Sequence, residues 1–273
     1  MPAIALENRV IIITGASRGL GRAMALAMAE AGGRLVLASP ESELLKSVAH
    51  EIYEKFGAGR ALAVTADITA RRDCEQLIEK TLDAYGTIDV LINNARRPHR
   101  GPGLPAKGNV LPFWESDADI WQETVHVNVN GTFLLTHLVA PHMIKKGSGR
   151  IINITTSLST MQRRHNSPYG VTKAALEAAT MIWAQDLLGT GVTVNSLIPG
   201  GRVHTDPATT PPPGDRALPV NIMNNVAVWL ASALSEGRTG GRYVGMLWDE
   251  TLRPDEAAAG ALEPPVLRPA DRE

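Results

Sequence analysis

The sequence predicts an α/β fold with one domain, in which a doubly wound parallel β-sheet carries helices on both faces. Short apolar runs alternate with helical patterns from residue 10 to about residue 247. A glycine-rich loop lies between the first apolar run and the first helical pattern, and no linker divides the chain. Alternation of strand and helix favours a parallel sheet of the doubly wound type.

Four strands are predicted in the first half of the chain, because each is a short run of apolar or β-branched residues. They cover residues 10–13, 35–38, 61–65 and 90–92. Helices are predicted after the first three strands, over residues 23–31, 41–56 and 71–85. Gly32 and Gly33 end the first helix in the manner usual for glycine.

The second half begins with a loop over residues 96–112, which are rich in Gly, Pro and Arg. Three more strands are predicted over residues 150–154, 192–197 and 243–247, and a proline-rich loop over 202–219. The accompanying helices are predicted over residues 117–146, 167–188 and 222–234. Residues 249–273 are rich in Ala, Pro and charge, so residues 1–248 are predicted to form the domain and 249–273 a surface or disordered tail.

Composition excludes several classes of protein. The chain has 273 residues, of which 44% are hydrophobic and 20% charged, as expected for a globular protein with a sizeable core. A net charge of −1 and an aromatic content of 4% argue against nucleic acid or an anionic membrane as a partner. The single cysteine, Cys74, suits a reducing compartment. No apolar run reaches the length of a membrane span and no secretory signal begins the chain, so we expect a cytoplasmic protein, without a metal site.

The glycine-rich loop predicts a dinucleotide-binding site of the Rossmann type. Gly15, Gly19 and Gly21 follow a buried strand and open a helix. Glycine permits a tight turn and a close approach of backbone to phosphate, and the helix N-terminus offers free N–H groups to a pyrophosphate. The spacing is G-x-x-x-G-x-G and not the more common G-x-G-x-x-G. A glycine-rich turn without a ligand is the alternative interpretation.

Tyr169 and Lys173 form a candidate catalytic pair. They are four residues apart on a predicted helix and therefore lie on one face of it. A cation beside the hydroxyl favours the phenolate and lowers the pKa of a tyrosine. Tyr169 is thus a candidate general acid/base that moves a proton on or off a substrate oxygen. An ordinary exposed pair of helix residues is the alternative, which the glycine-rich loop disfavours.

Five motifs in order resemble those of the short-chain dehydrogenase/reductases. They are Thr14-Gly-Ala-Ser-Arg-Gly-Leu-Gly21, Asn93-Asn94-Ala95, Asn128 within Val-Asn-Val-Asn-Gly131, Tyr169-Gly-Val-Thr-Lys173 and Pro199-Gly200. The resemblance covers about residues 6–247 and is to the short, single-domain branch of the family. It implies an NAD(P)-dependent oxidoreductase that interconverts a ketone or aldehyde and an alcohol.

The resemblance also implies roles for individual residues. Tyr169 would protonate the carbonyl oxygen while the nicotinamide delivers a hydride, or accept the alcohol proton in reverse. Lys173 would lower the pKa of Tyr169 and hydrogen-bond the nicotinamide ribose. Asn128 would steady a water chain to the lysine, with a helix-kinking structural amide as the alternative. The expected cofactor-binding residues are Gly15, Ser17, Arg18, Gly19, Leu20, Gly21, Ser39, Asp67, Ile68, Asn94, Ala95, Tyr169, Lys173, Pro199, Gly200 and Thr205.

The sequence departs from the family pattern at three positions. Thr156 stands where the family has the serine that holds the substrate oxygen, and Ser157 is the alternative if the loop shifts by one residue. Arg96 replaces the glycine of Asn-Asn-Ala-Gly, and either points outward or places a charge near the nicotinamide. Thr205 comes one residue later than the family threonine that contacts the carboxamide.

The choice between NAD and NADP is predicted from the end of the second strand. An acidic residue there would accept a hydrogen bond from the ribose 2′-OH and repel a 2′-phosphate. The chain has Ser39 and Pro40 at that point, whereas Arg18 in the glycine-rich loop can reach a 2′-phosphate. The sequence therefore predicts NADP(H) over NAD(H). Asp67 matches the family residue beside the adenine, with a helix N-cap as the alternative.

Basic side chains on two loops bear on the substrate. One group is Arg163, Arg164 and His165, and the other is Arg96, Arg97, His99 and Arg100. They favour an acidic substrate held by charge-assisted hydrogen bonds, unless they are solvated loop charges or pair with a neighbouring subunit. The stiff stretch 211–214 lacks the apolar helix that would cover a long chain, so a small or medium, polar or cyclic carbonyl is expected.

The family resemblance implies a homodimer or homotetramer that assembles through the helices at 117–146 and 167–188.

Two other functions share some of the motifs described above. A non-catalytic NADP-binding sensor or scaffold would explain Arg96 and Thr156, but it need not keep Tyr169, Lys173 and Asn128. A sugar-nucleotide epimerase shares the tyrosine and lysine, but the short C-terminal half leaves little room for its substrate domain.

Overall fold

A computed structural model describes residues 4–97, 111–205, 214 and 216–266. In these residues eight strands form one sheet in the order β3-β2-β1-β4-β5-β6-β7-β8, and every neighbouring pair is parallel except β7 with β8. The strands are β1 (Val10–Thr14), β2 (Arg34–Ser39), β3 (Ala61–Thr65), β4 (Val90–Asn93), β5 (Gly149–Ile154), β6 (Val192–Ile198), β7 (Arg242–Val244) and β8 (Leu262–Glu263). The predicted doubly wound parallel sheet is confirmed.

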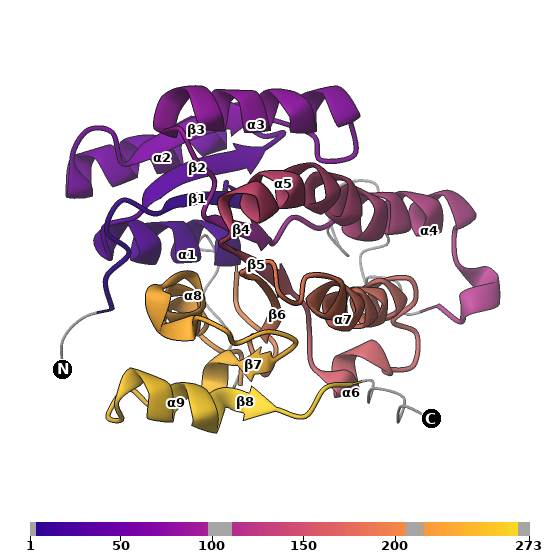
Figure 1. The fold of residues 1–273 in the computed structure, drawn as a ribbon. Coiled ribbons are helices and arrows are strands. Elements are labelled where there is room, and N and C mark those ends of the chain that lie inside the picture. Colours follow the sequence, from indigo (N-terminus) through magenta and orange to yellow (C-terminus); the bar gives the residue numbers. More distant parts are fainter. Residues whose placement is uncertain (1–3, 98–110, 206–213, 215, 267–273) are drawn as a thin grey trace.

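Helices cover both faces of the sheet (Figure 1). They are α1 (Gly19–Glu30), α2 (Ser42–Phe56), α3 (Arg71–Tyr85), α4 (Ala118–Val125), α5 (Thr132–Lys146), α6 (Leu158–Met161), α7 (Tyr169–Asp186), α8 (Asn224–Ala231) and α9 (Pro254–Ala261). Helices α1, α2 and α8 pack on one face, and α3, α5 and α7 on the other. The result is three layers, with the sheet in the middle.

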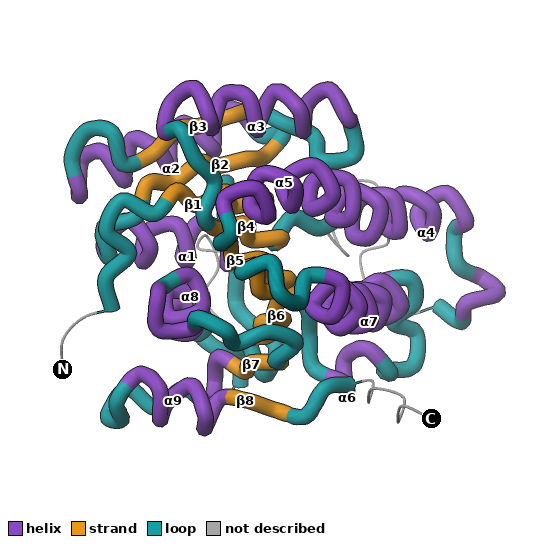
Figure 2. The backbone as a smooth tube through the Cα atoms, viewed as in Figure 1, coloured by secondary structure: helices purple, strands orange, loops and turns teal. Residues whose placement is uncertain are grey.

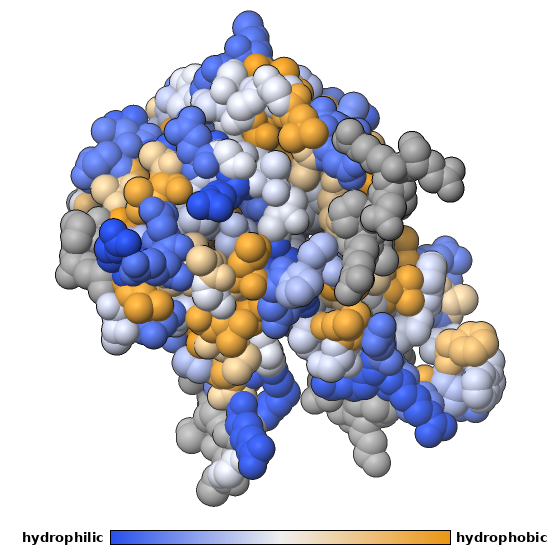
Figure 3. Space-filling model, turned by 60° about the horizontal axis from the view of Figure 1, so that its bottom comes forward, coloured by the Kyte–Doolittle hydropathy of each residue, from blue (hydrophilic) through white to orange (hydrophobic). Residues whose placement is uncertain are grey.

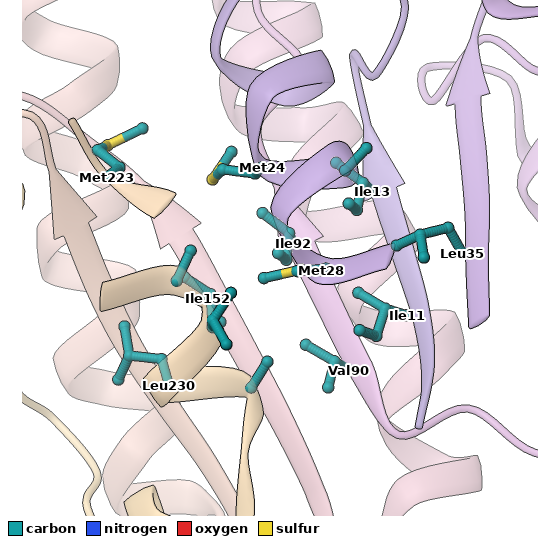
Figure 4. Close-up of a cluster of buried hydrophobic side chains, with 14 of the residues drawn as sticks. Ile11, Ile13, Met24, Met28, Leu35, Val90, Ile92, Ile152, Met223 and Leu230 are labelled. Carbon is teal, nitrogen blue, oxygen red and sulfur yellow. The ribbon is translucent and has the colours of Figure 1, made fainter. Parts of the chain in front are cut away.

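Alternate side chains of β1 point to opposite faces of the sheet, so this one strand contributes to the hydrophobic clusters on both faces. Ile11 and Ile13 belong to the cluster under α1 and α8, whereas Val10 and Ile12 belong to the opposite cluster. Figure 4 shows the first cluster, where Met24 and Met28 of α1 lie over Ile11 and Ile13. Successive strand residues point to opposite faces, so a strand buried on both sides is apolar throughout.

The structure divides the helix that was predicted over residues 117–146. Figure 2 shows one continuous helical run, but a π-helical turn, His126–Gly131, separates α4 from α5. Two other elements also begin or end at residues that differ from the predicted ones. The first helix begins at Gly19 rather than at residue 23, and β7 ends at Val244, where a short 3₁₀ helix replaces the rest of the predicted strand.

The predicted tail is wrong for part of its length. Residues 254–263 form α9 and β8, and β8 pairs with β7 as the last, antiparallel strand of the sheet. Ala257, Ala258 and Ala261 are buried on the inner face of α9. Alanine-rich composition resembles that of a loose tail, but these small side chains allow the short helix to pack closely. The final described residues therefore belong to the folded unit.

On the face drawn in Figure 3, hydrophobic residues form small patches among hydrophilic ones. Among the described helices, none is both long and apolar enough to cross a bilayer. No cluster of three or more His, Cys, Asp or Glu suited to a metal ion occurs in the same part of the chain.

Candidate active site

A cleft of about 340 Å³ opens beside the carboxyl ends of β1, β2, β3 and β4. The strand order reverses between β1 and β4, and open α/β sheets bind ligands outside the strand ends at such a point. The residues that line it are Gly15, Ser17, Arg18, Gly19, Leu20, Ala38, Ser39, Pro40, Glu41, Ala66, Asp67, Ile68, Asn94, Ala95, Arg96, Arg97, Val127 and Thr205. The structure thus brings together most of the predicted cofactor-binding residues.

The glycine-rich loop has the geometry of a phosphate cradle. Gly15 and Gly19 have φ angles of +64° and +54°, a region that favours glycine. A Cβ on Gly21 would lie 2.2 Å from the carbonyl oxygen of Gly15. Asn94 Nδ2 donates to the carbonyl oxygens of Thr14 and Gly15, at 2.9 and 3.1 Å, and so anchors the loop to β4.

The N-terminus of α1 is available to an anion. Its N-cap, Arg18, makes no side-chain capping hydrogen bond in the described structure, and the first turn contains no acidic residue. The first N–H groups of a helix lack intrahelical partners and carry the positive end of its dipole. The residues present therefore fit the pyrophosphate of a dinucleotide.

Glu41 supplies a carboxylate that the sequence analysis did not find. Its Oε2 accepts hydrogen bonds from Ser17 Oγ at 2.5 Å and Ser39 Oγ at 2.9 Å, while its Oε1 lies 2.6 Å from Arg18 Nη2. Burial opposes ionisation of Glu41, but the two hydroxyl groups and Arg18 outweigh it and lower the pKa of the carboxyl. The strand end itself carries Ser39 and no carboxylate, but the fold places the carboxylate of Glu41 against Ser39. Glu41 escaped notice because it lies two residues beyond the strand end.

Asp67 is not a helix N-cap. Its Oδ1 accepts hydrogen bonds from the backbone N and the Oγ1 of Thr69, at 2.9 and 2.8 Å, whereas α3 begins later, with Ala70 at its N-cap. Asp67 lines the cleft, and the neighbouring Ile68 is buried. The N-cap alternative for Asp67 is therefore wrong, and its place beside the adenine stays a prediction.

Lys173 lies beneath Tyr169, as the four-residue spacing predicts. Its Nζ is 5.9 Å from the centre of the Tyr169 ring and donates a hydrogen bond of 2.7 Å to the carbonyl oxygen of Ile154. Lys173 is only 2% exposed. Burial and, to a smaller extent, the nearby charge of Arg96 lower the pKa of Lys173 to about 7, while Glu177 acts in the opposite direction. The amine therefore titrates near neutral pH.

The pKa of Tyr169 is raised, and not lowered as the sequence predicts. Burial disfavours the phenolate and has the largest effect, while the charge of Arg96 and a hydrogen bond with Thr156 act in the opposite direction. The loss of exposure to water raises the pKa of Tyr169 by more than Arg96 and Thr156 lower it. Tyr169 is consequently protonated at neutral pH and placed to donate a proton.

The structure separates Thr156 from Ser157. The Thr156 side chain acts as a hydrogen-bond partner that lowers the pKa of the Tyr169 hydroxyl. Ser157 Oγ instead lies 3.2 Å from Ser159 Oγ and 2.9 Å from Thr160 Oγ1, within the start of α6. Thr156 is therefore the residue that stands beside the tyrosine.

Asn128 lies in the π-helical turn and is fully buried. Its Oδ1 accepts a hydrogen bond of 2.8 Å from the backbone N of Arg97, and its Nδ2 donates one of 3.0 Å to Thr172 Oγ1. The amide thus joins the loop after β4 to α7. Single π-helical turns inside α-helices occur frequently at functional sites.

Arg96 faces the site. It lines the cleft, and its charge acts on both Tyr169 and Lys173. Arg96 is exposed at the rim of this cleft, and a charge near the nicotinamide stays a prediction. The chain has a cation at a point where its family resemblance predicts a glycine.

The other predicted site residues differ in their distance from the cleft. Thr205 lines the cleft beside Gly19, whereas Pro199 and Gly200 lie outside the lining, where Pro199 accepts a backbone hydrogen bond of 3.1 Å from Met246. Arg163 and Arg164 are exposed beyond α6 and do not line the cleft either. His99, Arg100 and most of the stretch 211–214 lie outside the described residues.

Comparison with known proteins decides the family. Residues 9–211 match the family model for short chain dehydrogenases. The chain belongs to this family. Within it, a 3-oxoacyl-[acyl-carrier-protein] reductase of Synechocystis is 38% identical over 197 residues, which cover 72% of this chain and 75% of the relative.

Solved structures of the short chain dehydrogenases agree with the fold. The 3-ketoacyl-(acyl-carrier-protein) reductase of Brucella melitensis, complexed with NADH, is 28% identical with a TM-score of 0.76 and covers 87% of this chain and 96% of its own. A short chain dehydrogenase of Shigella flexneri 2a, complexed with NADP, is 26% identical with a TM-score of 0.77, covering 89% and 99%. This chain is an NAD(P)-dependent oxidoreductase that interconverts a ketone or aldehyde and an alcohol by hydride transfer. The comparisons do not support the non-catalytic alternative.

Proposed function

We propose that Tyr169 is the general acid/base of this oxidoreductase and that Thr156 holds the substrate oxygen. The hydrogen bond between Thr156 and Tyr169 carries this proposal, because one oxygen placed between two hydroxyl groups can be polarised and protonated together. When bound, the nicotinamide supplies or accepts the hydride. In reduction, Tyr169 gives its proton to the carbonyl oxygen. In oxidation, it takes the proton from the alcohol.

We assign positioning roles to the groups beneath the tyrosine. Lys173 would replace the proton of Tyr169 and hydrogen-bond the nicotinamide ribose, since its amine titrates near neutral pH. Asn128 joins the loop that carries Arg97 to the helix that carries Tyr169 and Lys173. The direct test is oxidation of NADH or NADPH by a panel of carbonyl compounds, followed by loss of nicotinamide absorbance. A purified, cofactor-binding protein that turns over none of them would contradict the proposal.

We propose that NAD(H) is preferred to NADP(H), which revises the preference predicted from the sequence. Arg18 and Ser39, the groups expected to receive a 2′-phosphate, already hold the carboxylate of Glu41. A ribose 2′-OH can donate to this carboxylate, whereas a 2′-phosphate meets its negative charge. Both interpretations require a nicotinamide cofactor, and the position of Glu41 supports NAD(H).

The preference is tested by Glu41→Gln. Removal of the carboxylate charge should tighten NADPH binding about tenfold, the change expected for a partly screened pair of like charges, and weaken NADH binding slightly. Fluorescence titration with each cofactor measures both affinities. Glu43→Gln, an exposed residue of the same helix, is the control and should change neither. Tighter NADPH binding by the wild type, unaffected by Glu41→Gln, would restore the NADP(H) prediction.

The substrate is proposed to be a small or medium carbonyl compound with an acidic group, as the basic loops suggest. Arg163→Ala should raise the KM for acidic substrates about two- to fivefold, because Arg163 is exposed and such charges contribute little each. The KM for neutral carbonyls should stay the same. Steady-state kinetics with matched acidic and neutral substrates measures the difference, and Arg72→Ala on α3 is the control. Equal effects on both substrates would identify Arg163 as a solvated loop charge.

We further propose a cytoplasmic homodimer or homotetramer. Large apolar side chains are exposed on the two helices expected at the interface: Phe133 of α5 at 53%, and Val171 and Ile182 of α7 at 51% and 55%. Contact between copies would remove this surface from water. Sedimentation equilibrium measures the assembly, and a monomer at all concentrations would contradict it.

A further inference from the structure

A buried charge network contacts the catalytic loop, by which we mean the segment that carries Thr155 and Thr156, and none of its charged residues lines the cleft. Its centre is Glu177 of α7, which pairs with Arg242 of β7, with 3.3 Å between Glu177 Oε1 and Arg242 Nε. Both side chains are 4% exposed. Two hydroxyl groups also donate to the carboxylate, Ser196 Oγ at 3.1 Å and Thr155 Oγ1. A buried charge is tolerated only when it is paired and hydrogen-bonded, as Glu177 is here.

The network reaches the catalytic loop at two points. Thr155, which donates to Glu177, is the residue directly before Thr156. Arg242 Nη2 donates a hydrogen bond of 3.3 Å to the carbonyl oxygen of Thr156 itself. Thr155 is thus held through its side chain, and Thr156 is held through its backbone carbonyl group. Both contacts restrict the direction in which the Thr156 hydroxyl points.

The network also includes the last strand of the sheet. Arg242 Nη1 forms a salt bridge with Glu263 of β8, a side chain that is 41% exposed. Arg242 and Glu263 both lie beyond residues 9–211, the part that matches the family model. The guanidinium therefore joins three groups at once: the carboxylates of Glu177 and Glu263 and the carbonyl oxygen of Thr156. Its planar fork of donors suits such a junction.

We propose that Glu177, Arg242 and Glu263 are positioning residues, which hold Thr155 and Thr156 so that the Thr156 hydroxyl meets Tyr169. The C-terminal strand β8 is then part of the active-site architecture. This inference rests on the proposed roles of Thr156 and Tyr169. A misplacement of about 1 Å at a reacting group can reduce the rate about a hundredfold, so contacts behind the site matter to turnover.

Two substitutions on the same carboxylate distinguish positioning from general stability. Thr155→Val keeps the shape of the side chain but removes its hydrogen bond to Glu177. Ser196→Ala also removes one hydrogen bond from Glu177, yet Ser196 lies on β6, outside the loop. We expect Thr155→Val to lower kcat about tenfold or more with cofactor affinity unchanged, and Ser196→Ala to lower Tm alone. Thr155→Ser, which keeps the hydroxyl, should restore most of kcat.

The second measurement does not depend on turnover. Glu263→Gln removes the charge that β8 presents to Arg242 and should accelerate backbone hydrogen exchange over residues 155–161. The affected amides include Thr155, which donates to Leu197 O, and Met161, which donates to Ser157 O. Exchange over β1 and α1 should stay the same. Glu256→Gln on α9, which alters an exposed pair with Arg253, is the control.

The outcomes separate the two proposals. If no carbonyl is turned over but Glu263→Gln loosens residues 155–161, the network holds the loop and the proposed function fails. Equal losses of kcat in Thr155→Val and Ser196→Ala would overturn the positioning role. Unchanged hydrogen exchange in Glu263→Gln would show that β8 does not help to hold Thr155 and Thr156 in place.

Discussion

Tyr169→Phe is expected to lose nearly all turnover and to keep its affinity for the nicotinamide cofactor. The substitution removes one oxygen, the only group of Tyr169 that can give a proton to the substrate. Loss of a general acid lowers rates by about 10²- to 10⁴-fold, and kcat should fall within this range. The cofactor cleft is lined mainly by the loops after β1 to β4 and does not include Tyr169, so binding should persist. Stopped-flow reduction of a carbonyl and fluorescence titration of the cofactor measure the two quantities.

Tyr53→Phe is the matched control, because Tyr53 lies on α2 and is 54% exposed. It should change neither kcat nor cofactor affinity. Turnover by Tyr169→Phe within about threefold of the wild type would mean that another group donates the proton, since a general acid contributes far more. Loss of cofactor binding together with turnover would give Tyr169 a structural role instead.

Lys173→Met is expected to lower activity and raise stability at neutral pH. Methionine nearly matches the lysine in length but carries no charge to bury. The protein loses the hydrogen bond to Ile154 O, and it also loses the cost of enclosing an amine whose pKa is lowered to about 7. Turnover should fall about a hundredfold or more, because the amine can no longer relay a proton to Tyr169. Urea unfolding and steady-state kinetics measure the opposite changes.

The stability gain should depend on pH in a defined direction. The pKa of Lys173 is about 7 in the folded protein, and its ordinary value is 10.5. Between these values the unfolded chain binds more protons at this position, so the wild type loses stability as pH falls from 10.5 toward 7. The advantage of Lys173→Met should therefore be largest near neutral pH and shrink as pH rises toward 10.5.

The exposed Lys80 of α3 supplies the control for this pH dependence. Lys80→Met should show no comparable change in relative stability across the same range. A constant difference between Lys173→Met and the wild type at every pH would show that Lys173 is not held in its neutral form. A loss of stability at all pH values would mean that the hydrogen bond to Ile154 outweighs the burial of the amine.

Local pattern was enough to predict most of the sheet and the phosphate cradle. The run Val10–Ile13 is apolar on both faces and predicts a strand buried between layers, and the glycines that follow permit the turn that a dinucleotide needs. The spacing of Tyr169 and Lys173 likewise follows from helix geometry alone. Such features depend on residues near one another in the chain, so periodicity and spacing reveal them.

Only the tertiary structure decided which groups surround these features. Glu41 meets Ser17 and Arg18 because α2 begins beside the glycine-rich loop, and burial raises the pKa of Tyr169 against the expected effect of Lys173. Thr156 and not Ser157 reaches Tyr169, and α9 with β8 packs where a tail was predicted. These outcomes depend on side-chain direction and loss of water, which arise from contacts between segments distant in sequence. The sequence by itself determined the fold class and the position of Lys173 beside Tyr169, and packing decided the electrostatics of this pair and its neighbours.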